Sequence, residues 1–418
     1  MRVICAMAVA AVAAAQEARK AEPPVPTPAN DEETKALDQR IDALEREVQT
    51  LRLRAEDVDS EAPPAAAATT APSANVFNPT ITAIGNGVYR WDDRPVLTDD
   101  GARIDRRFLL RDVELDMRAA VDPFADGLAI VAFAQEAPDE FAVEVEETYV
   151  TIKSLPVRGL EQPPLGLKLR VGRFLTETGR INRLHTHDLP HTQRPLAVTT
   201  FLGDEGFAGE GASAQMFVPF PFDDESAVEL TAQAVRGGGS AIAAGGTNEP
   251  AYVAHLRWFR TFADAHSVDL AGIAHEGALR PDGGARVWLF SADALYKWKP
   301  LRGGEFRSFV LAGQAFWART TRGDERPRGW FAWAQVQPLR SIYLGGRYDQ
   351  TSAVDDDAFR RRAASGYVSW YTSEFLRLRG GYERRVGDLL EENGRDSVFC
   401  EINFVFGSHP SEPFWVNR

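Results

Sequence analysis

The chain has little cysteine and little lysine. Among its 418 residues only Cys5 and Cys400 are cysteines, and six are lysines. Cys5 lies in the apolar stretch that opens the chain, so removal of that stretch leaves one cysteine, which excludes an internal disulfide and a cysteine-based metal cluster. The positive charge comes almost entirely from arginine, whose planar guanidinium suits both oxyanion contacts and ordinary ion pairs.

Long hydrophobic runs and excess positive charge are also missing. Past the apolar N-terminus, no window approaches the ~18 consecutive apolar residues of a transmembrane helix, although β-barrel strands need only ~9–11 residues of alternating character. Aspartate and glutamate number 60 against 47 lysines and arginines, a net charge of −13, which makes nucleic acid a poor partner. No Gly-x-Ser-x-Gly, His-Glu-x-x-His or phosphate-binding loop occurs, so the sequence predicts neither an enzyme nor a cofactor.

Residues 1–15 have the pattern of a cleaved export signal. Arg2 precedes an apolar stretch, and Ala13, Ala14 and Ala15 form a small-residue cleavage site before Gln16. We therefore expect a protein exported to the Gram-negative cell envelope.

Residues 31–58 predict a short coiled-coil helix. Apolar residues recur at alternating steps of four and three, with Ile41 and Val48 at a positions and Leu37, Leu44 and Leu51 at d positions. β-Branched residues at a positions with Leu at d positions favour a two-stranded coiled coil, that is, a pair of helices. A single amphipathic helix packed on another surface is the alternative. Residues 59–74 are rich in Ala, Pro and Thr and predict an extended linker. Such a helix could contact the cell wall.

Residues 75–407 show a period of two, which predicts an all-β fold, an antiparallel transmembrane β-barrel. Val113, Leu115 and Met117 alternate with Glu114 and Asp116, so one face suits lipid and the other water. About sixteen strands can be marked, at 80–90, 108–121, 127–135, 141–153, 164–173, 209–218, 226–236, 250–260, 266–276, 285–297, 305–319, 329–337, 341–349, 364–372, 375–385 and 396–406. The connections mostly alternate between short and long, as in bacterial barrels. Residues 408–418 form a C-terminal extension.

A soluble β-sandwich or propeller is the competing fold, because its strands alternate too. The export signal disfavours it, and so do aromatic residues at the ends of the expected strands, where the interface girdles of a membrane barrel lie. These aromatics are Trp91, Tyr296, Trp298, Trp330, Trp333, Tyr343, Trp370 and Tyr371.

The longest connection, residues 174–208, is the main candidate for a functional element. Loops of this length in compact folds are usually functional or disordered. If the first strand rises from the periplasm, this is the third outer loop, and a resemblance to general porins, in which that loop commonly folds inward and narrows the pore, implies that it is the constriction. Opposed charges in such a loop would set ion selectivity. The candidates in the loop are Arg180, Arg183, Arg194, Glu177, Asp188, Asp204 and Glu205. Candidates on the polar faces of strands are Arg118, Lys168, Arg170, Arg347, Arg377 and Arg379. These positive charges favour the passage of anions, whereas acidic residues on the same strands favour a pore wall of mixed charge and weak selectivity.

Three of the seven histidines also lie in this loop. His185, His187 and His191, with Asp188 between them, could bind zinc or another divalent ion. The more common use of such side chains is to anchor a loop by hydrogen bonds.

The organisation of the chain resembles the phosphate-selective porin O and P family. The likeness extends over residues 75–407 and includes the entry segment NVFNPTITAIGN and the last expected strand, SVFCEINFVFG. It implies a trimeric channel for phosphate or other anions, embedded in outer-membrane lipid. The leading prediction is a porin-like channel for passive diffusion of small solutes, anions among them. An envelope tether built on the coiled coil and a divalent-metal-handling barrel are the alternatives.

Overall fold

The computed structural model describes most of residues 79–417. Its gaps are 98–102, 138–139, 221–222, 224, 237–248, 279–284, 301–306, 322, 355–356, 358–359, 388–393 and 409–412. The expected export signal (1–15), coiled coil (31–58) and linker (59–74) lie outside the described residues and stay predictions.

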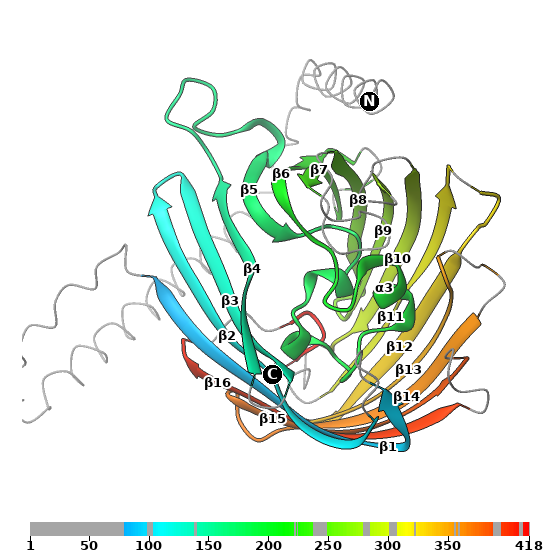
Figure 1. Ribbon diagram of the computed structural model, residues 1–418. Coiled ribbons are helices and arrows are strands. Elements are labelled where there is room, and N and C mark those ends of the chain that lie inside the picture. The colour runs from blue at the N-terminus through cyan, green and yellow to red at the C-terminus, as the bar shows by residue number, and fades with distance from the viewer. Residues whose placement is uncertain are drawn as a thin grey trace, which may run out of the picture. The chain divides into compact units, whose positions relative to one another are not determined.

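Sixteen antiparallel strands form one closed barrel (Figure 1). β1 pairs with both β2 and β16, so the first and last strands close the wall. The strands are β1 (Thr80–Leu97), β2 (Arg103–Asp122), β3 (Ala125–Ala137), β4 (Glu140–Ile152), β5 (Lys168–Leu175), β6 (Ala208–Val218), β7 (Ser226–Arg236), β8 (Pro250–Phe262), β9 (His266–Ala278), β10 (Arg286–Trp298), β11 (Ser308–Thr320), β12 (Arg328–Leu339), β13 (Ile342–Ser352), β14 (Arg360–Tyr371), β15 (Leu376–Val386) and β16 (Arg395–Gly407). A single closed sheet rules out the sandwich and the propeller.

The expected strand count is confirmed, and four of the expected boundaries are wrong by four residues or more: the end of β1 and the starts of β2, β5 and β14. The long connection expected over 91–107 is mostly strand, because β1 continues to Leu97 and β2 begins at Arg103. The strand expected over 164–173 begins only at Lys168. Pro164 cannot donate to a strand ladder, and the chain there forms a 3-10 turn (η1, Pro164–Gly166) in which Leu165 has a φ of 56°.

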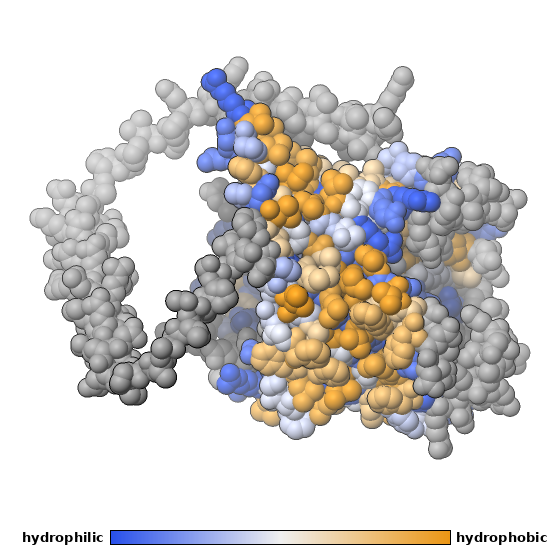
Figure 2. Space-filling view, turned by 60° about the vertical axis from the view of Figure 1, so that its left-hand side comes forward, coloured by the Kyte–Doolittle hydropathy of each residue, from blue (hydrophilic) through white to orange (hydrophobic). Residues whose placement is uncertain are grey.

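Large apolar side chains cover much of the outer wall. Phe108, Leu256, Phe290 and Val368 are among those exposed outside the barrel, and Figure 2 shows hydrophobic side chains dominating one face of the wall. This pattern is typical of strands that contact lipid on one side. None of the described helices is long and apolar enough to cross a membrane.

The connection between β5 and β6 folds into the barrel interior (Figure 1). It contains η2 (Ile181–Arg183), η3 (Thr186–Asp188) and the short helix α3 (Leu196–Leu202). Its apolar side chains pack against the inner faces of β10–β13; Phe201, for example, stacks on Phe316 of β11 with ring centroids 5.5 Å apart. We call residues 176–207 the inner loop. One side of the interior is therefore packed protein.

The described part of the C-terminal extension, residues 413–417, lies inside the barrel as well. Trp415 is fully buried, and its indole N–H donates to the carbonyl of Asp188 in the inner loop at 2.8 Å. The Gln337 side chain and the Tyr343 hydroxyl donate to the carbonyl of Asn417 at 2.7 and 2.8 Å. This segment joins the inner loop to β12 and β13.

Three aromatics expected in the interface girdles face inward instead. Trp333, Tyr343 and Tyr371 are buried, because the C-terminal segment provides an apolar partner for them; the rings of Tyr343 and Tyr371 each lie 6.4 Å from that of Trp415. Trp330 and Trp370 are exposed on the outer wall, as the girdle interpretation expects.

Candidate functional site

Four arginines of the wall hold the inner loop through its backbone. They donate to carbonyls of residues 187–193: Arg111 to Thr192, Arg347 to Gln193, Arg377 to His187 and Arg379 to Leu189. A buried carbonyl without a donor is costly, so these contacts satisfy a stretch of loop backbone that forms no strand ladder. We call the four side chains the arginine anchors.

Buried carboxylates neutralise the arginine anchors. The Glu401 carboxylate lies 2.6 Å from Arg377, 3.2 Å from Arg379 and 3.7 Å from Arg111. The pairs with Arg377 and Arg379 are almost entirely out of water, where removal of one partner leaves an uncompensated charge, whereas Arg111 is partly exposed.

Arg347 has carboxylate partners of its own. Its guanidinium lies 2.5 Å from Asp349 and 2.6 Å from Glu383. The structure thus places Arg347, Arg377 and Arg379, which the sequence suggests as pore-lining residues, between the wall and the inner loop.

The arginines of the inner loop itself also have partners. Arg180 pairs with Asp293 at 2.8 Å and with Asp269 at 3.3 Å, which ties the loop to β10 and β9. Arg194 donates to the carbonyls of Ile181 and Leu184, both within the loop. Burial lowers the pKa of Arg194 to about 10.

A cavity of about 400 Å³ lies beside the inner loop, along the inner faces of β2–β8. Its lining holds six carboxylate side chains, four arginines and two histidines. Seven residues suggested by the sequence belong to it: Arg118, Arg170, Glu177, Arg183, His185, His187 and Asp188. Lys168, by contrast, is exposed at the start of β5.

Most of the charges lining this cavity are paired. Arg118 lies 2.6 Å from Asp116, and Arg183 lies 2.9 Å from Glu177. Arg170 stands over the ring of Tyr149 at 4.6 Å. The cavity is therefore polar, with charges of both signs and more carboxylates than arginines.

A second cavity, of about 260 Å³, includes Asp204 and Glu205 of the inner loop in its lining. Burial raises the pKa of Glu205, and the nearby carboxylate of Glu146 adds to the effect. Both cavities border His185 and Leu175. His185 thus stands where the two cavities meet.

His185 is held there by carboxylates of β4. Its Nδ1 lies 2.5 Å from Glu146 and its Nε2 lies 3.0 Å from Glu147. Burial alone lowers the pKa of His185, but Glu114, Glu146 and Glu147 outweigh burial and raise it well above its ordinary value.

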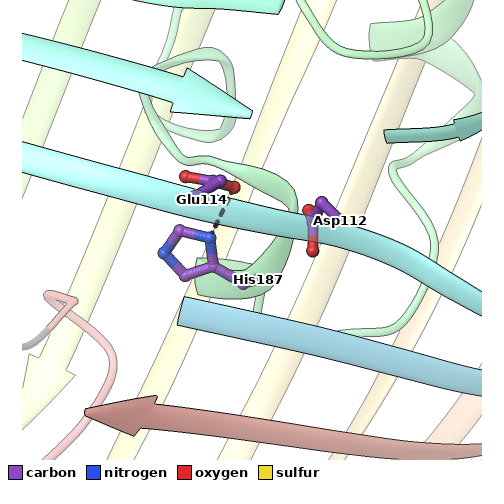
Figure 3. Close-up of side chains that lie close together, drawn as sticks. All are labelled: Asp112, Glu114 and His187. Carbon is purple, nitrogen blue, oxygen red and sulfur yellow. Dashed lines mark hydrogen bonds and ion pairs between the residues drawn. The ribbon is translucent and has the colours of Figure 1, made fainter. Parts of the chain in front are cut away.

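His187 faces carboxylates of β2 (Figure 3). Its Nδ1 lies 2.8 Å from Glu114 Oε1, and its ring stacks on that of His185 with centroids 5.9 Å apart. Burial lowers the pKa of His187, but Glu114 and Asp188 outweigh it and raise the pKa to about 9. Asp112, on the same face of β2, completes the group drawn in Figure 3.

The structure does not bring His191 to the other two histidines. Its ring packs edge-on against Trp333, with centroids 6.5 Å apart. Burial lowers the pKa of His191 well below its ordinary value, and Arg347 and Arg379 add to the effect. In place of His191, the structure gathers carboxylates that the sequence could not assign to the site: Asp112, Glu114, Glu146 and Glu147.

Comparison with solved structures identifies the architecture. An anion-selective porin from Comamonas acidovorans matches with a TM-score of 0.52 and 9% identity, covering 78% of this chain and 99% of that one. The OmpF protein of Salmonella typhi, in complex with daunomycin, matches with a TM-score of 0.51 and 13% identity, covering 79% and 98%. The DcaP outer-membrane channel of Acinetobacter baumannii matches with a TM-score of 0.50 and 12% identity, covering 78% and 97%.

The chain has a porin-type barrel. At such low identities the likeness shows the fold alone, and no known family profile matches the sequence. An uncharacterized protein of Aquifex aeolicus (strain VF5) is 32% identical over 117 residues. That match spans 28% of this chain and 22% of the Aquifex protein.

Proposed function

We propose that this protein is an outer-membrane channel through which small polar solutes diffuse passively. The main support is a closed barrel with an apolar outer wall and two charged cavities that meet at His185. An apolar exterior and a polar interior are what a lipid-embedded diffusion channel needs. The export signal expected at residues 1–15 agrees with this location.

In this proposal the inner loop is the constriction. The inner loop crosses the interior, and the two cavities stay open beside it along β2–β8. Solutes would therefore pass the junction formed by His185, Glu146 and Glu147. Charged groups at the narrowest point act on a permeating ion at short range and set selectivity there.

The proposed selectivity is weak, with a preference for cations. Three of the arginines that suggest anion passage in the sequence are engaged by the inner loop, whereas the linings of the two cavities together hold ten carboxylates against six arginines and two histidines with raised pKa values. Phosphate passage, which the family resemblance implies, stays a prediction and has less support from the lining than passage of small cations.

We also propose that the barrels associate as trimers. Trimers follow from the family resemblance, and OmpT of Vibrio cholerae, whose fold matches with a TM-score of 0.50 and 10% identity, is described in a trimer form. Analytical ultracentrifugation of the detergent-solubilised protein gives the oligomer mass.

Conductance in planar lipid bilayers tests the channel. The refolded full-length protein should produce stepwise currents, and a salt gradient should give a small reversal potential whose sign indicates cations. A reversal potential of the opposite sign would overturn the cation preference. If the folded barrel inserts and yields no current steps, the channel function is wrong.

A further inference from the structure

Glu114 is common to two groups of candidate metal ligands. One consists of Asp112, Glu114 and His187 (Figure 3), and the other of Glu114, Glu146 and His185. Within each group all the ligand atoms lie within 4.8 Å of one another. Asp112 and Glu114 are two residues apart on β2 and so share its inner face, while Glu146 comes from β4 and the histidines from the inner loop.

Two carboxylate oxygens of this cluster are buried without a hydrogen bond from any described residue. They are Asp112 Oδ1 and Glu114 Oε2. The side chains are only 6% and 1% exposed, and a buried carboxylate oxygen without a partner is costly. Both oxygens therefore have a free lone pair for a ligand.

The cluster also carries an excess of negative charge. Glu147 and Asp188 add two carboxylates, at 3.0 Å from His185 and 3.5 Å from His187. Two protonated imidazoles can balance two of the five carboxylates at most.

Nearby arginines do not supply the remaining positive charge by direct contact. Arg111 donates to Asn86 and to the carbonyl of Thr192, and Arg194 donates to carbonyls of the inner loop. A cation held among the carboxylates would offset their repulsion.

We propose that Asp112, Glu114, Glu146, His185 and His187 bind a divalent transition-metal ion such as zinc, with Glu114 as the shared ligand. Imidazole nitrogen together with carboxylate oxygen suits zinc and its neighbours in the first transition row, whereas calcium prefers oxygen ligands alone. The ion has access from both sides, because Glu114, His185 and His187 border the first cavity and Glu146 and His185 the second.

The bound ion fastens the inner loop to β2 and β4. All five ligands come from these three segments, so the site adds side-chain contacts from β2 and β4 to the backbone contacts that the arginine anchors make with the loop. It also neutralises acidic groups at the junction of the two cavities. The metal site does not depend on the channel function, since ligand binding can be measured without any current.

Isothermal titration calorimetry with zinc chloride tests the site. The full-length protein is refolded in detergent, stripped with EDTA and dialysed, then titrated beside Glu114→Gln and Glu229→Gln. Glu229 lines the same cavity, and its carboxylate accepts a hydrogen bond from Gln215 outside the cluster, so Glu229→Gln is a matched control.

Wild type and Glu229→Gln should bind zinc alike. Glu114→Gln should weaken zinc binding by at least ~10-fold, because even outer-shell partners of a metal are worth ~10–100-fold in affinity. If Glu114→Gln loses the β-sheet circular dichroism spectrum, the double variant His185→Gln/His187→Gln is titrated with zinc instead. It should bind zinc more weakly in the same way.

Three results would overturn the metal site. The first is a folded wild type that binds no zinc, and the second is equal zinc binding by the wild type and the cluster variants. The third is binding of calcium in preference to zinc, which would contradict the role assigned to the imidazoles.

Discussion

Replacement of Trp415 by alanine should widen the channel. The Trp415 side chain is fully enclosed by the inner loop and the rings of Tyr343 and Tyr371. Hydrogen bonds from Gln335 and Gln337 to its carbonyls also hold the C-terminal segment, and so do its other apolar side chains: Val416 is buried, and the ring of Phe414 lies 6.4 Å from that of Trp333. Trp415 is the largest buried side chain of the segment.

The magnitude follows from the burial of this side chain. Truncating a buried tryptophan to alanine costs about 3–5 kcal/mol, and this range includes the lost indole hydrogen bond to Asp188, worth about 1 kcal/mol. Each 1.4 kcal/mol is a factor of ten, so the seated state of residues 413–417 should become less favourable by about 100- to 4000-fold.

Single-channel recording in planar bilayers is the assay, with Trp370→Ala as the control. Trp370 is a residue of the same type on the outer wall, where it is 48% exposed, so its loss leaves the interior unchanged. Trp415→Ala should show larger current steps or frequent excursions to a larger step, and Trp370→Ala should match wild type.

Unchanged steps in Trp415→Ala would refute this reasoning, because they would mean that the C-terminal segment does not obstruct the path. Equal increases in both variants would also refute it, since the effect would then come from general loosening of the barrel. Removal of residues 413–418 should reproduce the Trp415→Ala result in protein refolded from urea.

Three further predictions concern the walls and the inner loop. Glu401→Gln should destabilise the barrel by about 3–5 kcal/mol in urea unfolding, because it leaves the buried Arg377 and Arg379 without their shared carboxylate. A change below 1 kcal/mol, about the worth of an exposed ion pair, would contradict the anchor role. Gly179→Ala should loosen the inner loop and increase its proteolysis. Gly179 has a φ of 134°, and a Cβ there would lie 2.2 Å from the Gln314 side chain. An unchanged digestion pattern would contradict this prediction. Cys400, exposed on the outer face of β16, should react in liposomes with a membrane-permeant maleimide and resist an impermeant one, because lipid covers this face. Equal labelling by the two reagents would place the outer face of β16 in water.

The strand pattern could be predicted because it depends on neighbouring residues. Apolar side chains that face lipid alternate with polar side chains that face water, with a period of two residues, and this pattern is visible in short stretches of sequence. This is why most expected strands agree with the observed ones. The extension of β1 past residue 90 was missed for a physical reason. The charged residues around Arg90 and Asp92 are typical of an exposed loop. In the barrel, however, these two side chains pair with each other at 2.7 Å, and the Ser397 hydroxyl of β16 donates to Asp92.

The site could be predicted only in part. The length of the connection after β5 indicated an inward loop, and its histidines marked the right segment. Their partners could not be read from the sequence, because Glu114 lies 73 residues from His187 and Glu146 lies 39 from His185. The inward position of Trp415 had one available signal, the apolar run Phe414–Val416 after a polar stretch.

The scarcity of lysine and the position of the inner loop have a common explanation in the arginine anchors. Arg347 contacts two carboxylates and a loop carbonyl at once, and Arg377 contacts Glu401 and the carbonyl of His187. A guanidinium can do this because it has five N–H donors in a flat fork, whereas an ammonium is a compact point charge with three. An arginine row in a barrel therefore has two possible meanings, an anion path or an internal scaffold. Here the carbonyl contacts identify the scaffold, so under the channel proposal a solute meets the charged groups that line the two cavities, among which carboxylates outnumber arginines.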